Sequence, residues 1–201
     1  RLKLNGWCKS TCPNDQEFWS YDYVRESPLT REIEDWALSP MRFPKINILQ
    51  IALPTHESIW SIIPTFNYLT SLAIRNDSTL QFLQWNIRST SIRRLDLMQW
   101  DTENHLYCNA ATCFTLIDSL WRHQCEVLSI DIENRSIVID LISRMSNLRS
   151  LTVRCNDDEL KNSDLSSVHD EFIDWLKICL PSKCSIRRHK SDINIWINKE
   201  N

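Results

Sequence analysis

The residue types best suited to hold a metal ion lie between positions 105 and 123. There the sequence reads H-x2-C-x4-C-x9-H, formed by His105, Cys108, Cys113 and His123. Zinc requires four nitrogen or sulfur ligands that converge, and its structural sites usually place them on two short knuckles with tight turns. This stretch contains no glycine, and Cys113 and His123 would flank a helix. We therefore expect these residues to belong to a loop and to the core, with no metal and no cofactor.

The eight cysteines would permit disulfides, but disulfide-stapled domains are usually shorter and richer in glycine than this 201-residue chain, whose one glycine is Gly6. Cys125 and Cys155 fall in predicted strands, where a free cysteine packs like a small apolar side chain. We predict reduced thiols and a cytoplasmic or nuclear protein. Two N-x-S sequons, at Asn76 and Asn134, keep a secreted protein open as the alternative.

The same shortage of glycine bears on enzymatic chemistry. Phosphate-binding loops of the G-x-x-x-x-G-K-[ST] and G-x-G-x-x-G types need several glycines, so a chain with one glycine has neither. No G-x-S-x-G nucleophile elbow is present either. We predict that the protein is not an enzyme. The alternative is an enzyme with a site at the carboxyl ends of an open parallel sheet, where such sites commonly lie.

Acidic residues would gather at those same carboxyl ends. Several carboxylate oxygens together can bind a hard cation, although a solvated acidic rim is the commoner outcome. The residues concerned are Asp101, Glu103, Asp131, Asp157, Asp158 and Glu159.

The overall charge gives no sign of a polyanionic partner. The formal net charge is -3 and the pI is near 6.0, so we expect no nucleic-acid binding. No apolar run approaches the roughly 20 residues of a membrane span, so we expect no membrane partner.

The elements that would position all these residues follow a repeated L-x-x-L-x-L pattern. Its clearest copy runs from Leu148 to Asn156, where alternation along a strand would turn Leu151 and Val153 into the core. Asn156 stands where a side-chain amide would satisfy backbone groups at the turn. The five copies are spaced by 21, 23, 33 and 23 residues, and they begin at Ile48, Leu69, Ile92, Cys125 and Leu148.

Helical patterns separate the copies, which predicts parallel strands with right-handed crossovers and an α/β fold. One predicted stripe comprises Phe114, Ile117, Leu120 and Trp121, and Ser136 would cap a later helix. The last helix would begin at Ser167 or Asp170 and precede a terminal hairpin, or a last parallel strand followed by an antiparallel one. We predict a partial repeat or irregular segment at 1–45 and a repeat array at 46–160. Residues 161–201 would form a helix-and-strand cap of the same domain.

Residues 46–156 resemble an irregular leucine-rich-repeat array. Their variable spacing, few glycines and many Cys and Trp residues are similar to the substrate-receptor arrays that follow an F-box in ubiquitin-ligase adaptors. The resemblance implies a curved solenoid with strands on the concave face and helices on the convex face. It also implies a protein partner, a monomeric module of a longer chain, and substrate recognition in a ubiquitin-ligase adaptor. The copies depart from the family pattern at the position of Asn156, which is occupied elsewhere by His56, Asp77, Trp100 and Glu133.

Strand residues that face away from the core would form the functional surface. We expect this surface to bind a protein across the concave face and to contribute nothing to packing. Because it includes carboxylates, which repel phosphates, it suits a protein better than a polyanion. A purely structural segment of a larger protein is the further alternative. The predicted partner-binding residues are Arg75, Arg94, Asp96, Met98, Asp131 and Arg154.

Overall fold

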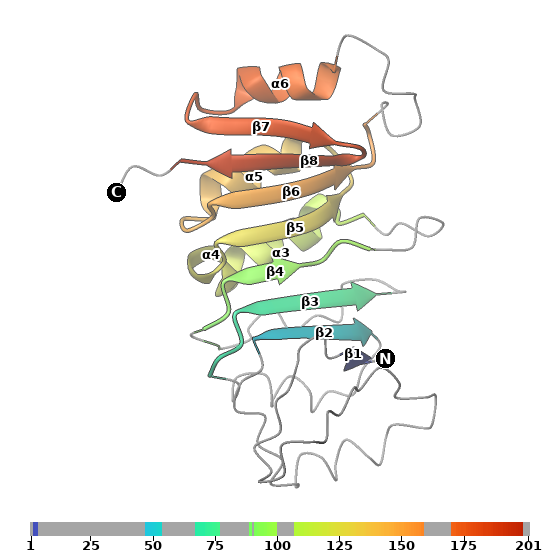
Figure 1. Ribbon diagram of the computed structural model, residues 1–201. Coiled ribbons are helices and arrows are strands. Elements are labelled where there is room, and N and C mark those ends of the chain that lie inside the picture. Colours follow the sequence, from blue (N-terminus) through green and yellow to red (C-terminus); the bar gives the residue numbers. More distant parts are fainter. Residues whose placement is uncertain are drawn as a thin grey trace, which may run out of the picture.

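The protein is a mixed α/β structure, as predicted. The described part of the chain contains four helices and one open sheet with the strand order β1-β2-β3-β4-β5-β6-β8-β7 (Figure 1). Most of the predicted segment 1–45 lies outside that part. The computed structural model describes residues 2–3, 47–53, 67–76, 89, 91–99, 107–158 and 170–198.

The centre of the sheet is parallel. It consists of strands β2 to β6, and each of them up to β5 pairs in parallel with the next one in sequence. They are β2 Ile48–Leu53, β3 Ser71–Asn76, β4 Arg94–Asp96, β5 Val127–Ile132 and β6 Ser150–Cys155. The short strand β1 (Leu2–Lys3) pairs antiparallel with β2 at one edge, and an antiparallel hairpin forms the other edge.

The repeated pattern produces straight ladders of apolar side chains through the core. One ladder is formed by the residue at the second apolar position of the L-x-x-L-x-L pattern in each strand. These residues pair with one another across the strands and are at most 1% exposed: Leu49, Leu72, Leu95, Leu128 and Leu151. A second ladder contains Ile74, Ile130 and Val153, which are equally buried. The prediction that Leu151 and Val153 belong to the core is therefore confirmed.

The first copy of the motif is shifted from its predicted frame. Ile48 is 49% exposed, whereas Leu49 is 1% exposed and pairs with Leu72. The prediction that this copy begins at Ile48 is wrong by two residues, because a strand rich in apolar residues fits the pattern in two frames and only pairing with β3 selects one. In the corrected frame Leu49, Leu72 and Leu95 follow one another at intervals of 23 residues.

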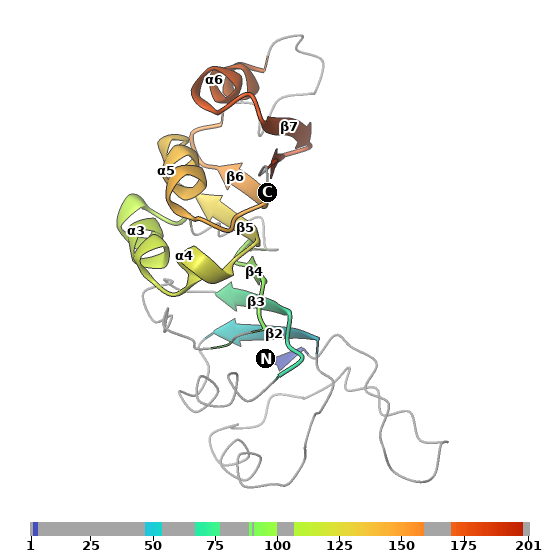
Figure 2. The same ribbon diagram turned by 90° about the vertical axis from the view of Figure 1, so that its left-hand side faces the viewer.

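The described helices lie on one side of the sheet (Figure 2). They are α3 Ala110–Asp118, α4 Trp121–Gln124, α5 Ser136–Arg144 and α6 Glu171–Cys179. The Asn109 side chain caps α3 by accepting a hydrogen bond from the Thr112 backbone N–H at 2.9 Å. In α5, Ile137, Val138 and Leu141 face the core. Ser136, which was predicted to cap this helix, is instead its first residue, and Arg135 occupies the cap position without a side-chain hydrogen bond to the helix.

The predicted helical stripe from Phe114 to Trp121 is only half right. Ile117 and Trp121 are buried, but Phe114 is 39% and Leu120 43% exposed. The stripe assumed one continuous helix, whereas α3 ends before Ser119, whose hydroxyl donates to the Leu116 carbonyl at 2.6 Å. Phe114 lies on the exposed side of α3, and Leu120 stands in the break between α3 and α4.

The C-terminal elements follow the prediction closely. Asp170 caps α6, because its carboxylate accepts from the Ile173 backbone N–H at 3.0 Å. The terminal hairpin is confirmed and consists of β7 (Cys184–His189) and β8 (Asp192–Ile197). Lys190, in the turn between them, adopts a left-handed φ of 58°. Strand β8 pairs antiparallel with β6, so β7 is the outermost strand.

Candidate functional site

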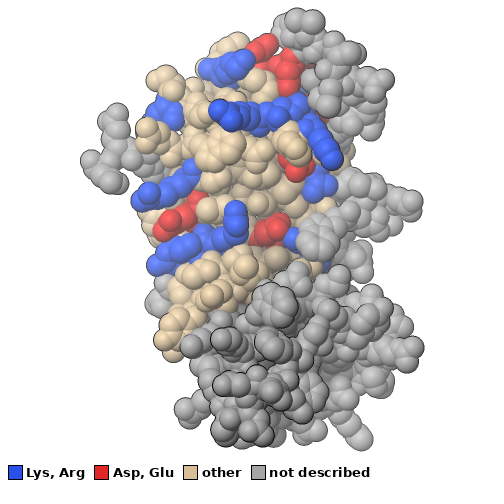
Figure 3. Space-filling view, in the orientation of Figure 1, with Lys and Arg blue, Asp and Glu red and all other residues tan. Residues whose placement is uncertain are grey.

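The side of the sheet opposite the helices, called the open face below, carries the strand residues that alternate with the core ladders. The strand register arranges them in three rows that run across the strands. The first row contains Ile48, Ser71, Arg94, Val127, Ser150, Trp196 and Ser185. The middle row contains Gln50, Ala73, Asp96, Ser129, Thr152, Asn194 and Arg187. The third row contains Arg75, Asp131, Arg154, Asp192 and His189. Figure 3 shows Lys and Arg side chains spread over this face, with carboxylates between them.

One ion pair links the third row to the middle row. The Arg75 guanidinium donates from Nη2 to Asp96 Oδ2 at 2.8 Å, and the two side chains are 12% and 29% exposed. Asp96 also accepts a hydrogen bond from the Met98 backbone N–H at 3.1 Å. The charges of this pair are therefore matched within the sheet.

A second ion pair joins β5 and β6. Arg154 Nε lies 3.2 Å from Asp131 Oδ1, and the two side chains are 14% and 1% exposed. The backbone of Gln99 contacts both partners: its N–H donates to Asp131 Oδ2 at 2.7 Å, and its carbonyl accepts from Arg154 Nη2 at 3.0 Å. Arg154 also lies 3.1 Å from Asp192. This pair fastens the segment after β4 onto the sheet.

The expectation that the six predicted residues take no part in packing is therefore wrong for several of them. Asp131 is 0% and Met98 7% exposed, and Arg154 is occupied by its two carboxylates. Strand alternation correctly placed these side chains away from the core ladders. It could not show that the segment after β4 continues along β5, where the Leu97 N–H donates to the Ser129 carbonyl at 2.7 Å. Arg94 stays exposed in the first row.

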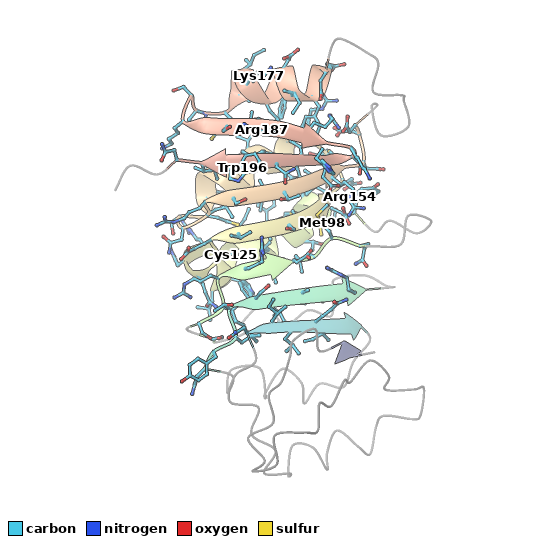
Figure 4. All side chains as sticks on the ribbon, viewed as in Figure 1. Met98, Cys125, Arg154, Lys177, Arg187 and Trp196 are labelled. Atoms are coloured by element: carbon cyan, nitrogen blue, oxygen red, sulfur yellow. The ribbon has the colours of Figure 1, made fainter. Side chains whose placement is uncertain are left out.

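Two exposed residues of the open face were not predicted as part of the site. Trp196 is 44% exposed on β8, and Arg187 is exposed on β7; Figure 4 shows both on the open side of the sheet. The sequence does hold a signal for Trp196. Ile193, Ile195 and Ile197 alternate into the core, so the residue between the last two must face outward.

The cysteines of the candidate metal motif belong to the core. Cys108 and Cys113 are 3% and 2% exposed, and a hydrogen bond between the two thiols, together with burial, raises the pKa of the Cys108 thiol well above its ordinary value. His123 is exposed on α4 and its Nδ1 lies 2.9 Å from Ser146 Oγ, while His105 lies outside the described residues. Among the residues that the structure describes, no three His, Cys, Asp or Glu side chains are placed to hold a metal ion.

The six cysteines that the structure describes are free thiols. Cys125 and Cys155 are buried in the core, as expected of small apolar side chains. Cys179 is exposed at the end of α6, and Cys184 is half-buried at the start of β7.

The acidic residues near the carboxyl ends of β5 and β6 face arginines. Asp157 lies 3.4 Å from Arg135, and Asp158 accepts two hydrogen bonds from Arg188 at 2.6 and 3.2 Å. With Asp131 beside its own arginine, three carboxylates are each neutralised by a guanidinium, an arrangement that does not suit a cation site. The other predicted members, Asp101, Glu103 and Glu159, lie outside the described residues.

Arg188 joins two elements that are distant in sequence. Its guanidinium contacts Asp158, directly after β6, and Asp170, the cap of α6, at 2.5 Å. Burial alone would raise the pKa of Asp170, but hydrogen bonds from Arg188 and from the Ile173 N–H outweigh it and hold the pKa below its ordinary value. The end of β6, the start of α6 and β7 are thereby held together by one charged cluster.

In the described part of the protein, no helix has the length and apolar character needed to cross a membrane. A comparison with protein-family models, with curated proteins and with solved structures finds no significant match.

Proposed function

We propose that the protein is a non-enzymatic recognition module that binds another protein across the open face. The observation that carries this proposal is the one-sided covering of the sheet. Parallel sheets are usually covered on both faces. In the described part of this protein the helices lie on one side only, and the open face carries Ile48 and Trp196 at 49% and 44% exposure.

The repeat geometry supports a leucine-rich-repeat-like solenoid in which the open face is concave. The core ladders recur at 23 residues between Leu49, Leu72 and Leu95 and again between Leu128 and Leu151. Intervals of this length are typical of such repeats, whose concave surfaces are extended binding surfaces. Substrate recognition within a ubiquitin-ligase adaptor is the form of this function that the sequence resemblance implies, as one module of a longer chain.

The charges of the open face favour binding over acid–base chemistry. A catalytic carboxylate needs access to substrate and a pKa suited to proton transfer. Asp131 is instead buried against Arg154, and Asp96 is held by Arg75. Ion pairs of this kind restrict the side chains of a surface, and such preorganisation lowers the entropy that is lost when a partner binds.

Site-specific photo-crosslinking in cell extract tests which side of the sheet is used. A benzophenone amino acid is introduced at Ser150 or Ser185 on the open face, and in matched variants at Thr115 on α3 or Ile178 on α6. The helix positions are exposed, Ile178 by 84%, so they are at least as accessible to a partner as Ser150 and Ser185. We expect a discrete protein adduct from the open-face positions and not from the helix positions.

The reverse pattern, with adducts from Thr115 or Ile178 alone, would assign binding to the helical side and contradict the proposal. Melting curves of the four variants serve as the folding control. An absence of adducts from every position would count against a recognition function and would favour a purely structural segment.

A further inference from the structure

The four arginines of the open face fall into two classes. Arg75 and Arg154 are engaged with carboxylates of the same sheet. The side chains of Arg94 and Arg187 are exposed, and neither makes a hydrogen bond or an ion pair with any residue that the structure describes. A guanidinium is planar and presents five donors, which match a carboxylate in pairs. Among the described residues of the three rows, Arg94 and Arg187 are therefore the arginines whose donors are available to a partner.

These two arginines lie at opposite ends of a smooth stretch of sheet. Arg94 is on β4 and Arg187 on β7, with β5, β6 and β8 between them. At a strand spacing of about 4.8 Å, they stand about 19 Å apart across the strands. The side chains between them are mostly small and partly exposed, among them Ser129, Ser150 and Thr152. An extended chain can lie over such residues, and their hydroxyls can bond its backbone.

Trp196 lies along the same path. In the strand register it stands between Ser150 of β6 and Ser185 of β7, about 14 Å from the strand of Arg94. Its indole is 44% exposed and rises beside the small neighbours. Trp and Arg are the residue types that most often dominate the energy of an interface. The path thus offers a cationic group, an apolar anchor and a second cationic group in sequence.

We infer that the open face binds an extended acidic segment of its protein partner, which crosses the strands from β4 to β7. This inference rests on the function proposed above and names the chemistry of the ligand. Carboxylates of the segment pair with Arg94 and Arg187, and an apolar side chain packs on Trp196. At about 3.3 Å per residue, the two acidic residues are about six positions apart, and the apolar residue comes about four positions after the acid that pairs with Arg94.

The carboxylates that remain on this face distinguish an acidic peptide from a nucleic acid. The side chains of Asp96 and Asp192 are 29% and 36% exposed and lie in the rows beside the path. Both are already paired, with Arg75 and Arg154. A continuous phosphate backbone would therefore find no further available arginine between Arg94 and Arg187 in the three rows, whereas two discrete carboxylates need no more than these two. Two separate arginines also differ from the basic stripe that is typical of nucleic-acid binding.

The test uses a random 12-residue peptide library displayed on phage and selected on the full chain. We expect enrichment of peptides with two acidic residues about six positions apart and a large apolar residue between them. A selected peptide is then synthesised with a fluorophore, and its Kd is measured by anisotropy. Arg94→Gln, Arg187→Gln and Trp196→Ser should each weaken binding about tenfold or more.

Arg149→Gln is the matched control, since Arg149 is 63% exposed and belongs to none of the three rows. It should change the Kd by less than about twofold, and a thymidine 20-mer should not displace the peptide. Selection of peptides without acidic residues, equal effects at all three arginines, or displacement by the oligonucleotide would overturn the inference. If Ser150 still crosslinks a partner in that case, the open-face function stands and only the ligand chemistry is wrong.

Discussion

Asp131 and Arg154 occupy neighbouring strands at the same level of the sheet, and the carboxylate of Asp131 is completely buried beneath its partner's guanidinium, 3.2 Å from it. Both also hold the backbone of Gln99. A charge removed from water in this way depends on its counter-ion. The pair is therefore a structural element of the open face, unlike the exposed Arg94 and Arg187.

Arg154→Ala should lower the free energy of unfolding by about 3–5 kcal/mol, because it leaves the Asp131 carboxylate buried without its counter-ion. Urea unfolding followed by circular dichroism measures the change. Arg94→Ala is the control: it removes an arginine of the same face that has no such partner, and it should stay within about 0.5 kcal/mol of the wild type. Equal stability of the two variants would contradict the burial of the pair.

Leu151→Ala should destabilise the protein by about 2–5 kcal/mol through lost apolar contact and the cavity left in the shared ladder. The adjacent Ser150 points to the open face, so Ser150→Ala should be nearly neutral. Thermal unfolding of both variants checks the difference. A larger loss for Ser150→Ala would mean that β6 presents its other side to the core.

The Arg188 cluster should make stability sensitive to acid. The pKa of Asp170 is lowered in the folded state, so the unfolded chain binds more protons near the ordinary value of 3.8. The contribution of Asp170 is therefore fully present above that value, and it is lost as the pH falls below it. In Asp170→Asn, which keeps a cap for α6, the deficit in unfolding free energy should be constant from pH 5 to 7 and shrink towards pH 2.

Asp118→Asn is the control for this titration. Asp118 is 66% exposed and lies 3.8 Å from Arg144, and an ion pair exposed at the surface in this way contributes little to stability. Its unfolding free energy should follow that of the wild type at every pH. A deficit of Asp170→Asn that does not change with pH would refute the acid dependence.

The thiols should differ sharply in reactivity. Burial raises the pKa of Cys125 to about 12, so at pH 8 its thiol is protonated as well as shielded, whereas Cys179 is exposed. Iodoacetamide should modify Cys179 within minutes and Cys125 only at the rate of global unfolding. Peptide mass spectrometry over a time course measures both rates, and the addition of urea should make them converge. Similar rates in native buffer would contradict the burial of Cys125.

The strands were predictable because each copy of the motif combines local alternation with a recurring interval. Where those two signals agree, as at Leu128 and Leu151, the core positions follow directly. At β2 the local signal was ambiguous, since Ile48 and Leu49 are both apolar and only pairing with β3 decides which is buried. The register between two strands is set by their pairing in the folded protein, so it cannot be inferred from the sequence of one strand.

The site was less predictable for the same reason. Alternation identifies outward side chains such as Arg75 and Asp131, but pairing across strands decides whether an outward charge remains available. The sequence alone did not show which arginines would find carboxylates within reach. Trp196 and Arg187 were overlooked because the hairpin continues the sheet in antiparallel direction, outside the repeat from which the surface was derived.

The antiparallel hairpin at one edge of the sheet also affects the tendency of the protein to aggregate at high concentration. A sheet of parallel repeats ending in a flat apolar strand would be a template on which a second molecule could add its own strand. Here the outermost strand, β7, carries Arg187, Arg188 and His189 and is flanked by Lys183 and Lys190. Like charges on two such edges repel, so this border discourages growth into fibres while the open face beside it stays accessible.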